Sequence, residues 1–565
     1  MTIVANPAAM AEASWEDLAP IYQELADRPL GPEDVESWLA DWSRFEAALS
    51  ETISSAMIAY TCDTLDPEKE GAHRRFSIEI APKAEEQGVR LAIKFAALNW
   101  SRPGLEQMVA RFRRAIETFR PENVVLASEL EETATAYQGI TGGFMASWEG
   151  AKKPLPQLSP FLQNPDRSVR ERAFRAATEP YLDARGQLAT LFDRQYSLRC
   201  QVAANAGFAS YQEFAFATKF RFDYGPADCR RFHEAVEAVA VPAVERLHRY
   251  RQDALKVQQL RPWDLAVTLH RDQPLRPFAT GRELEARATR LFDRLDPALA
   301  RQFRTMIDER LLDLESRQGK APGGYCDTLH HRGRPFIFMN AAGVMEDVQT
   351  LLHEAGHAFH AFAAHAQSLI WQRHPTAEAA ELASMSMELL AAPLLDAEGA
   401  FLSARDAAVA RIEHGEDILI TLCHIAAVDA FQSWIYTSGE GHDAAARDQA
   451  WVEIRRRFDP VVDWSDLEPY RIARWYRQLH IFLYPFYYIE YGIAQLGALQ
   501  VWQNHRRDPA GALASYRRFL ALGATASLPD LYRAAEARLV FDREGMAPLV
   551  AAVEAEIAGL RSQLR

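Results

Sequence analysis

The sequence predicts a mainly α-helical protein with one small β-sheet. Apolar residues recur at spacings of three and four over most of the chain, with few internal prolines. Residues 321–347 differ, because they combine glycines with short runs of β-prone residues. The length of 565 residues, 48% of them hydrophobic and 25% charged, is that of a globular protein with a large core.

Seven long stretches have the helical pattern, with apolar residues falling on one face of a 3.6-residue period. They are 33–60, 104–138, 168–204, 228–258, 281–317, 405–436 and 511–563. A proline-rich stretch at 149–166 is interpreted as a connection between helices. A second break is expected from Leu260 to Thr280, where Pro262, Pro274 and Pro277 lie.

The glycine-containing region is predicted to form two short strands. They are Tyr325–Leu329 and Pro335–Asn340, joined by a turn at Arg332–Arg334. This hairpin either braces the following helix or binds substrate, in which case an extended peptide would pair with the edge of the 335–340 strand. The preceding glycine pair suits close backbone approach, a mobile loop or an ordinary turn. The candidate substrate contacts in this region are Gly323, Gly324, Tyr325 and Phe338.

Charge and cysteine usage narrow the class of protein. The formal net charge is −14, without the basic surplus of a nucleic-acid binder, so we expect no nucleic-acid partner. The five cysteines form no CxxC pair, which is typical of reduced thiols in a cytoplasmic protein. The first residues have no leader pattern, and the apolar stretches at 389–402 and 418–432 contain Asp, Glu or His. We therefore expect buried helices there and no membrane partner.

One motif carries chemistry. Residues 353–357 read His-Glu-Ala-Gly-His within a helical pattern, and positions four apart lie on one helix face. His353 and His357 can therefore present two imidazoles to one metal ion. Glu354 is adjacent to the first histidine and is the candidate general base, as in zincins.

A catalytic zinc usually has three protein ligands, and the third is not obvious from this motif alone. The metzincin solution fails, because Ala363 stands where that class has its third histidine. The gluzincin solution uses a glutamate on a following helix, predicted here at 376–392. Three glutamates share one face of that helix, and a solvated helix edge is the alternative explanation for them. They are Glu378, Glu381 and Glu388.

HEAGHAFH, followed by Glu381 in ExxSxxxE, resembles the M3 metallopeptidases, in particular the oligoendopeptidase F-like branch. GGYC at 323–326, PFIFMN at 335–340 and the stretch 479–498 are also similar to that family. The resemblance implies a two-lobed, gluzincin-like fold with a deep substrate channel. It also implies one Zn²⁺ per chain, held by His353, His357 and Glu381, with Glu388 orienting a histidine. Glu378 has no clear family counterpart and is the alternative ligand.

The late segment has its own pattern. Pro485 predicts a helix start nearby, so Tyr488 and Tyr491 would share a helical face, with His480 and Tyr484 in the preceding turn. Phenol and imidazole groups could stabilise the oxyanion that forms when water attacks a peptide carbonyl. An aromatic core patch is the alternative. The family resemblance favours a catalytic role for His480, Tyr488 and Tyr491 and a substrate contact for Tyr484.

Together these features predict a zinc-dependent endopeptidase that hydrolyses short unstructured peptides, with an N-terminal helical lobe over 1–190 and a catalytic region over 191–565. A carboxypeptidase-like or dipeptidyl zinc peptidase is one alternative. A non-catalytic peptide-binding scaffold is another, although such a protein would not need Glu354. The oligomeric state is not readable from the sequence.

Overall fold

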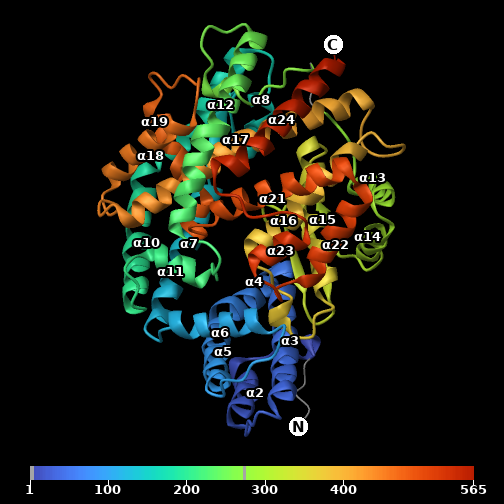
Figure 1. Cartoon of the computed structure of the whole chain (residues 1–565). Coiled ribbons are helices and arrows are strands. Elements are labelled where there is room, and N and C mark those ends of the chain that lie inside the picture. The colour runs from blue at the N-terminus through green and yellow to red at the C-terminus, as the bar shows by residue number, and fades with distance from the viewer. Residues whose placement is uncertain (1–5, 272–274, 565) are drawn as a thin grey trace. The chain divides into compact units, whose positions relative to one another are not determined.

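The computed structural model describes residues 6–271 and 275–564, and most of them are helical (Figure 1). The prediction of a mainly α-helical chain with a small sheet is confirmed. The described residues divide into two compact units that interleave along the sequence. Unit 1 comprises 6–121, 275–407 and 494–539, and unit 2 comprises 122–271, 408–493 and 540–564. The lobe boundary at residue 190 stays a prediction.

Unit 1 holds the HEAGH motif. Its helices are α1 (Pro7–Met10), α2 (Trp15–Asp27), α3 (Val35–Cys62), α4 (Pro67–Arg74), the π-helix η1 (Arg75–Ile80), α5 (Ala81–Ala96), α6 (Glu106–Thr118), α13 (Gly281–Leu295), α14 (Pro297–Asp308), α15 (Met345–Ala364), η4 (Ile370–Gln372), α16 (Ala377–Ala391), η5 (Ala392–Leu394), α22 (Pro509–Leu522) and α23 (Leu528–Ala534). Its strands are β3 (Leu312–Glu315), β4 (Tyr325–Leu329) and β5 (Arg334–Ala341).

The sheet of unit 1 has the order β3-β5-β4. The predicted hairpin is confirmed as the antiparallel pair β4–β5, in which Cys326 is paired with Ile337. β5 is also paired in parallel with β3, so it is the central strand. The expectation that the 335–340 strand offers an edge to substrate is therefore wrong, because both of its edges are already paired.

Unit 2 is helical apart from a short hairpin. Its elements are α7 (Asn123–Gly142), β1 (Met145–Trp148), β2 (Ala151–Pro154), η2 (Leu155–Leu158), α8 (Ser159–Leu162), α9 (Arg167–Asp183), α10 (Arg185–Asn205), α11 (Tyr211–Thr218), α12 (Pro226–Leu255), η3 (Pro262–Asp264), α18 (Ala444–Phe458), α19 (Glu468–Tyr476), α20 (Leu479–Leu483) and α24 (Arg543–Leu564). Two helices, α17 (Ala404–Thr437) and α21 (Tyr488–Arg507), have residues in both units.

Several predicted long helices are interrupted where local caps compete with the helical pattern. The stretch 281–317 divides into α13 and α14, because Asp296 caps the second helix and Pro297 occupies its first turn. Its last residues form strand β3 instead of the predicted helix. The stretch 511–563 divides after α22 at Gly523, whose φ of 53° suits a residue without a side chain. The stretch 104–138 divides into α6 and α7, and 168–204 into α9 and α10.

The apolar stretch 418–432 lies within helix α17. By length and hydropathy α17 could cross a membrane, but 67% of its most apolar window is buried inside the protein, as in the core helix of a globular protein. Two sequence predictions fall partly outside the described residues. These are the N-terminal segment, of which residues 1–5 are not described, and the predicted break at 260–280, of which Pro274 is not described.

Candidate active site

Helix α15 presents the two motif histidines side by side. Asp347 fixes the start of the helix by accepting the backbone N–H of Val344 at 2.8 Å. The opposite side of the helix packs into the core through apolar residues that include Leu351, Ala355 and Phe359. The rings of His353 and His357, one turn apart, have their centroids 4.9 Å from each other. Burial of the apolar face thus turns both imidazoles toward the same side.

A glycine brings α16 close to this helix. A Cβ atom at Gly356 would lie 2.5 Å from the Cα of Ser384 and 2.7 Å from the carbonyl oxygen of Ala383. Real Cβ atoms do not approach other heavy atoms so closely, so the contact requires glycine. The close approach of the two backbones lets the short side chain of Glu381 on α16 reach the histidines on α15.

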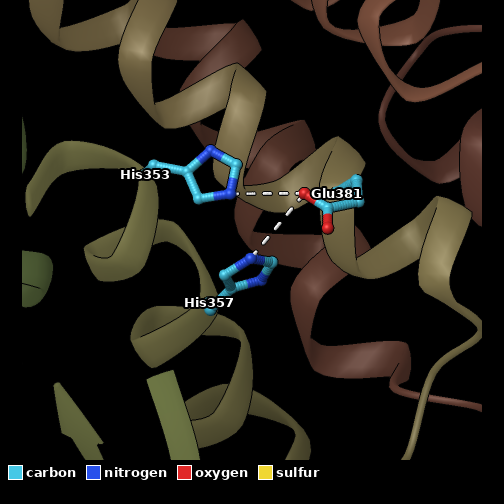
Figure 2. A group of neighbouring side chains, drawn as sticks. All are labelled: His353, His357 and Glu381. Carbon is cyan, nitrogen blue, oxygen red and sulfur yellow. Dashed lines mark ion pairs between the residues drawn. The ribbon is translucent and has the colours of Figure 1, made fainter. Parts of the chain in front are cut away.

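Three ligand-type atoms converge between these helices (Figure 2). The Oε2 atom of Glu381 lies 3.3 Å from His353 Nε2 and 3.8 Å from His357 Nε2. One ligand atom from each of the three residues lies within 4.8 Å of the other two. Two imidazole nitrogens and one carboxylate oxygen suit a divalent transition-metal ion. The residues present therefore fit a bound metal.

The outer contacts fix the orientation of these groups. His353 Nδ1 donates to Glu388 Oε1 at 2.7 Å, since a carboxylate can only accept, and Nε2 is then the ring nitrogen that faces Glu381. The hydroxyl of Ser384 donates to Oε2 of Glu381 at 3.0 Å. Ser384 is fully buried. Sequence reasoning assigned it no role, although its place three residues after Glu381 on a helix was a usable signal.

The electrostatics of the cluster favour a positive charge. Burial alone would lower the pKa of His353, but the carboxylates of Glu381 and Glu388 outweigh it and raise that pKa well above its ordinary value. Burial lowers the pKa of His357 to about 4, against the opposing charge of Glu381. Two carboxylates around two imidazoles thus stabilise a cation at this position.

The protein environment raises the pKa of Glu354 toward neutrality. Burial raises the pKa of its carboxyl group to about 7, and the negative charges of Glu381 and Glu388 act in the same direction. The neighbouring His353 opposes this shift, as does a hydrogen bond from the backbone of Cys326 in β4. A carboxyl group with a pKa near neutrality can both accept and return a proton at physiological pH. The backbone contact from β4 could not be predicted from the sequence.

Glu378 lies apart from the convergent triad. It is buried in the first turn of α16. Burial lowers the pKa of Arg111 to about 10 and raises the pKa of Tyr532, and the charge of Glu378 opposes the first shift and adds to the second. It is not among the three residues whose ligand atoms converge.

The candidate substrate contacts around the β4–β5 hairpin differ in accessibility. Gly323 has a φ of 101°, which favours glycine in the turn before β4, whereas a Cβ atom on Gly324 would make only ordinary contact with the carbonyl oxygen of Phe338, at 3.4 Å. Tyr325 is half-buried, and its hydroxyl lies 2.6 Å from Thr61 Oγ1. The side chain of Phe338 is fully buried in the central strand, with its ring stacked on Tyr325 at 4.9 Å. This position argues against a direct substrate contact by Phe338, because neither its ring nor its paired backbone is accessible.

The late aromatic segment forms one cluster in unit 2. His480 lies in the short helix α20 instead of a turn, and α21 begins at Tyr488 as predicted. The ring of His480 lies 4.9 Å from that of Tyr488 and 5.9 Å from that of Tyr491, and the Tyr491 hydroxyl is 3.4 Å from His480 Nε2. Tyr484 is 55% exposed, so its phenol is accessible to a ligand.

Buried groups hold the turn between α20 and α21 in place. Phe486 has a φ of 62°, an unfavourable conformation for a bulky residue. Its backbone N–H donates to Gln432 Oε1 at 2.7 Å, and its carbonyl accepts from the guanidinium of Arg221. Arg221 also pairs with Glu490 at 2.7 Å. The strained turn is thus maintained by its surroundings, as is common where side chains must be placed accurately.

Comparison with known proteins identifies the family. Residues 161–548, more than half of the chain, match the sequence profile described as Peptidase family M3. The chain belongs to peptidase family M3. The resemblance inferred from HEAGH and ExxSxxxE is therefore confirmed, and the protein is a peptidase.

Individual relatives agree with this assignment. This M3 peptidase is 22% identical to an oligoendopeptidase F homolog of Borreliella burgdorferi over 434 residues, which are 73% of this chain and 71% of that protein. Its structure is similar to that of PZ peptidase A with inhibitor 2, with a TM-score of 0.88, 26% identity and coverage of 97% and 98%. It is also similar to a provisionally named oligoendopeptidase F, with a TM-score of 0.87, 27% identity and 97% of each chain covered.

Proposed function

We propose that this M3 peptidase is a zinc-dependent endopeptidase that hydrolyses short unstructured peptides. The observation that carries the proposal is the convergence of His353, His357 and Glu381 beside Glu354. Two histidines and a glutamate are a ligand set of catalytic zinc, and a glutamate next to the first histidine is the general base of such sites. The oligoendopeptidase names of the relatives support the preference for peptides.

In this proposal each residue has a distinct task. His353, His357 and Glu381 would hold one zinc ion, which when bound supplies a Lewis acid and lowers the pKa of water. Glu354 takes a proton from the attacking water on its carboxylate and later returns it to the leaving amine. Glu388 keeps His353 in one tautomer by accepting from Nδ1.

The aromatic cluster and the hairpin supply the remaining proposed contacts. Tyr488, Tyr491 and His480 donate hydrogen bonds to the oxyanion that forms on the scissile carbonyl. The support for this role is their clustering around one imidazole and the family resemblance of the segment. Gly323, Gly324, Tyr325 and Tyr484 contact the peptide chain, whereas Phe338 is left out because it is buried.

Metal analysis of four variants tests the proposal. His353→Ala and Glu381→Ala should lose zinc, whereas Glu354→Gln should keep zinc and the fold but lose activity at least a hundredfold, because only the base is removed. Glu378→Ala, a matched glutamate on the same helix, should retain zinc. Normal activity of Glu354→Gln would contradict the mechanism. Loss of zinc from Glu378→Ala but not from Glu381→Ala would show that the third ligand is wrongly assigned.

Product analysis separates the proposed endopeptidase from an exopeptidase that uses the same ligands. Peptides with blocked termini should be cleaved internally, and mass spectrometry identifies the two products. A carboxypeptidase-like or dipeptidyl enzyme would leave them intact. The same cleavable sequence inside a folded protein should be spared, because cleavage would first require local unfolding. Equal rates for the folded protein and the free peptide would contradict the preference for unstructured substrates.

A further inference from the structure

The hydroxyl group of Tyr488 already has a defined partner. It donates to Gln478 Oε1 at 3.1 Å. The orientation of the Gln478 amide is fixed independently, because its Nε2 donates to the carbonyl oxygen of Arg474 at 3.2 Å. The amide oxygen is therefore the atom that lies toward Tyr488.

A second donor reaches the same amide oxygen. His424 Nε2 lies 3.2 Å from Gln478 Oε1, and His424 Nδ1 lies 2.9 Å from Arg455 Nη1. Arginine can only donate, so Nδ1 must accept and the single ring proton must be on Nε2. Burial, followed by the charge of Arg455, lowers the pKa of His424 to about 3, which keeps the ring neutral. His424 therefore donates to Gln478.

Arg455 is itself held in place. Its Nε donates to Asp459 Oδ2 at 2.9 Å. The groups form one directed chain in unit 2, from Asp459 through Arg455, His424 and Gln478 to the phenol of Tyr488. Each member of the chain has one arrangement of donors and acceptors, so the position of the Tyr488 proton is determined by residues far from it in sequence.

We propose that Gln478, fixed by His424, is a positioning residue that holds the Tyr488 hydroxyl proton until a negatively charged oxygen competes for it. This inference rests on the proposed function, in which Tyr488 stabilises the oxyanion. No covalent bond changes in this step, because the hydroxyl only rotates about its C–O bond from one acceptor to the other.

The physical reason is the difference between neutral and charged acceptors. A bond from the phenol to the amide oxygen of Gln478 competes evenly with a bond to the neutral carbonyl of a bound peptide. A bond to an oxyanion is roughly twice as strong as a neutral one, so the developing charge draws the hydroxyl away from Gln478. The interaction with substrate is then made mainly in the transition state, which raises kcat without tightening substrate binding.

A double-mutant cycle tests the inference. Tyr488→Phe should lower kcat about a hundredfold, as loss of an oxyanion donor does. Gln478→Leu should lower kcat about tenfold with KM unchanged or reduced, because the freed hydroxyl can also bind the ground-state carbonyl. In the Tyr488→Phe background Gln478→Leu should change kcat by less than twofold, since the hydroxyl that it positions is gone.

Two further variants keep the test decisive. His424→Phe retains a ring but removes both nitrogens. It should lower kcat, as Gln478→Leu does, and it should have no such effect in the Tyr488→Phe background. Gln195→Leu is the matched control, because Gln195 is also a buried glutamine of unit 2 and its amide donates to Thr133 Oγ1 at 3.1 Å. The kcat of the Gln195→Leu variant should stay within twofold of the wild-type value.

The outcomes distinguish the two proposals. Losses that add in the double variant, or an unchanged kcat in both Gln478→Leu and His424→Phe, would overturn the positioning role alone. A wild-type kcat in Tyr488→Phe would overturn the oxyanion role of Tyr488 and this inference with it. Zinc content should be unaffected in all these variants. A loss of metal would show that the drop in kcat comes from a disturbed fold, and this would contradict the positioning role.

Discussion

At the scale of single residues, one carboxylate oxygen connects the whole candidate site. Oε2 of Glu381 is the atom toward which both histidine Nε2 atoms are directed, and it also accepts from Ser384. The serine hydroxyl limits the rotation of the carboxylate, so the lone pair left for a metal has a fixed direction. We therefore predict that Ser384 supports metal binding without being a ligand.

Replacement of this serine should weaken metal binding. Ser384→Ala is expected to reduce zinc affinity about tenfold or more, because outer contacts of metal ligands typically contribute that much. The measurement is competition with a calibrated chelator at fixed pH. Ser386→Ala is the matched control, since the Ser386 hydroxyl is equally buried on the same helix but has no hydrogen-bond partner among the described residues. Equal affinities for the two variants would contradict the role of Ser384.

Residues of the site differ in how far the sequence could predict them. The HEAGH motif indicates His353, Glu354 and His357, because helical spacing puts the two histidines on one face with the glutamate adjacent to the first. Choosing Glu381 over Glu378 required the family resemblance, since both residues lie on the same helical face. His424 and Gln478 could not be found, because 54 residues separate them and only the tertiary fold brings them into contact.

At the scale of elements, the contact between α15 and α16 sets the geometry of the site. Gly356→Ala would place a methyl group against the backbone of Ser384 and Ala383, and the two helices would have to separate. Overpacking of this kind costs about 1–3 kcal/mol. We expect a lower midpoint of thermal unfolding together with at least a tenfold loss of zinc affinity, because Glu381 moves away from the histidines.

A second glycine serves as the control for this prediction. Gly88 lies inside α5 of the same unit, and a Cβ atom there would meet nothing within 4 Å. Gly88→Ala should stabilise the protein by about 0.5–1 kcal/mol and leave zinc binding unchanged, since alanine favours the helix. Wild-type stability and zinc affinity in Gly356→Ala would show that the helices tolerate the extra methyl group and that the close contact is not required.

The elements also show which structural features are local in origin. The β4–β5 hairpin was predicted because two β-prone runs and a turn adjoin each other in sequence. The pairing of β5 with β3 was missed, because two parallel strands are separated by a long connection and no local sequence pattern indicates that they pair. Helix ends at Asp296 and Gly523 were missed where a cap or a left-handed residue outweighs continuing apolar periodicity.

At the scale of the whole molecule, both units bury histidines in the neutral state. In unit 1 burial lowers the pKa of His330 to about 2, with the nearby His374, Arg373 and His365 acting in the same direction. In unit 2 the pKa of His424 falls to about 3. Folding therefore excludes protons that these imidazoles would bind in the unfolded chain, where the ordinary pKa is about 6.5.

This exclusion predicts a loss of stability in mild acid. Below about pH 6.5 the unfolded state binds more protons than the native state, so the free energy of unfolding falls as pH decreases toward the lowered native pKa values. Each such histidine contributes a slope of about 1.4 kcal/mol per pH unit. Urea unfolding of the metal-free protein at pH 7.5, 6 and 5 measures the effect without interference from metal release.

Removal of one titrating ring isolates its share of the effect. His330→Phe keeps an aromatic ring in the buried position 4.0 Å from His374, but it cannot bind a proton. Between pH 6.5 and 5 this variant should lose about 1–2 kcal/mol less of its free energy of unfolding than the wild type. An identical pH dependence for His330→Phe and the wild type would mean that His330 binds protons as readily in the native state as in the unfolded chain, so that it contributes nothing to the loss of stability in acid.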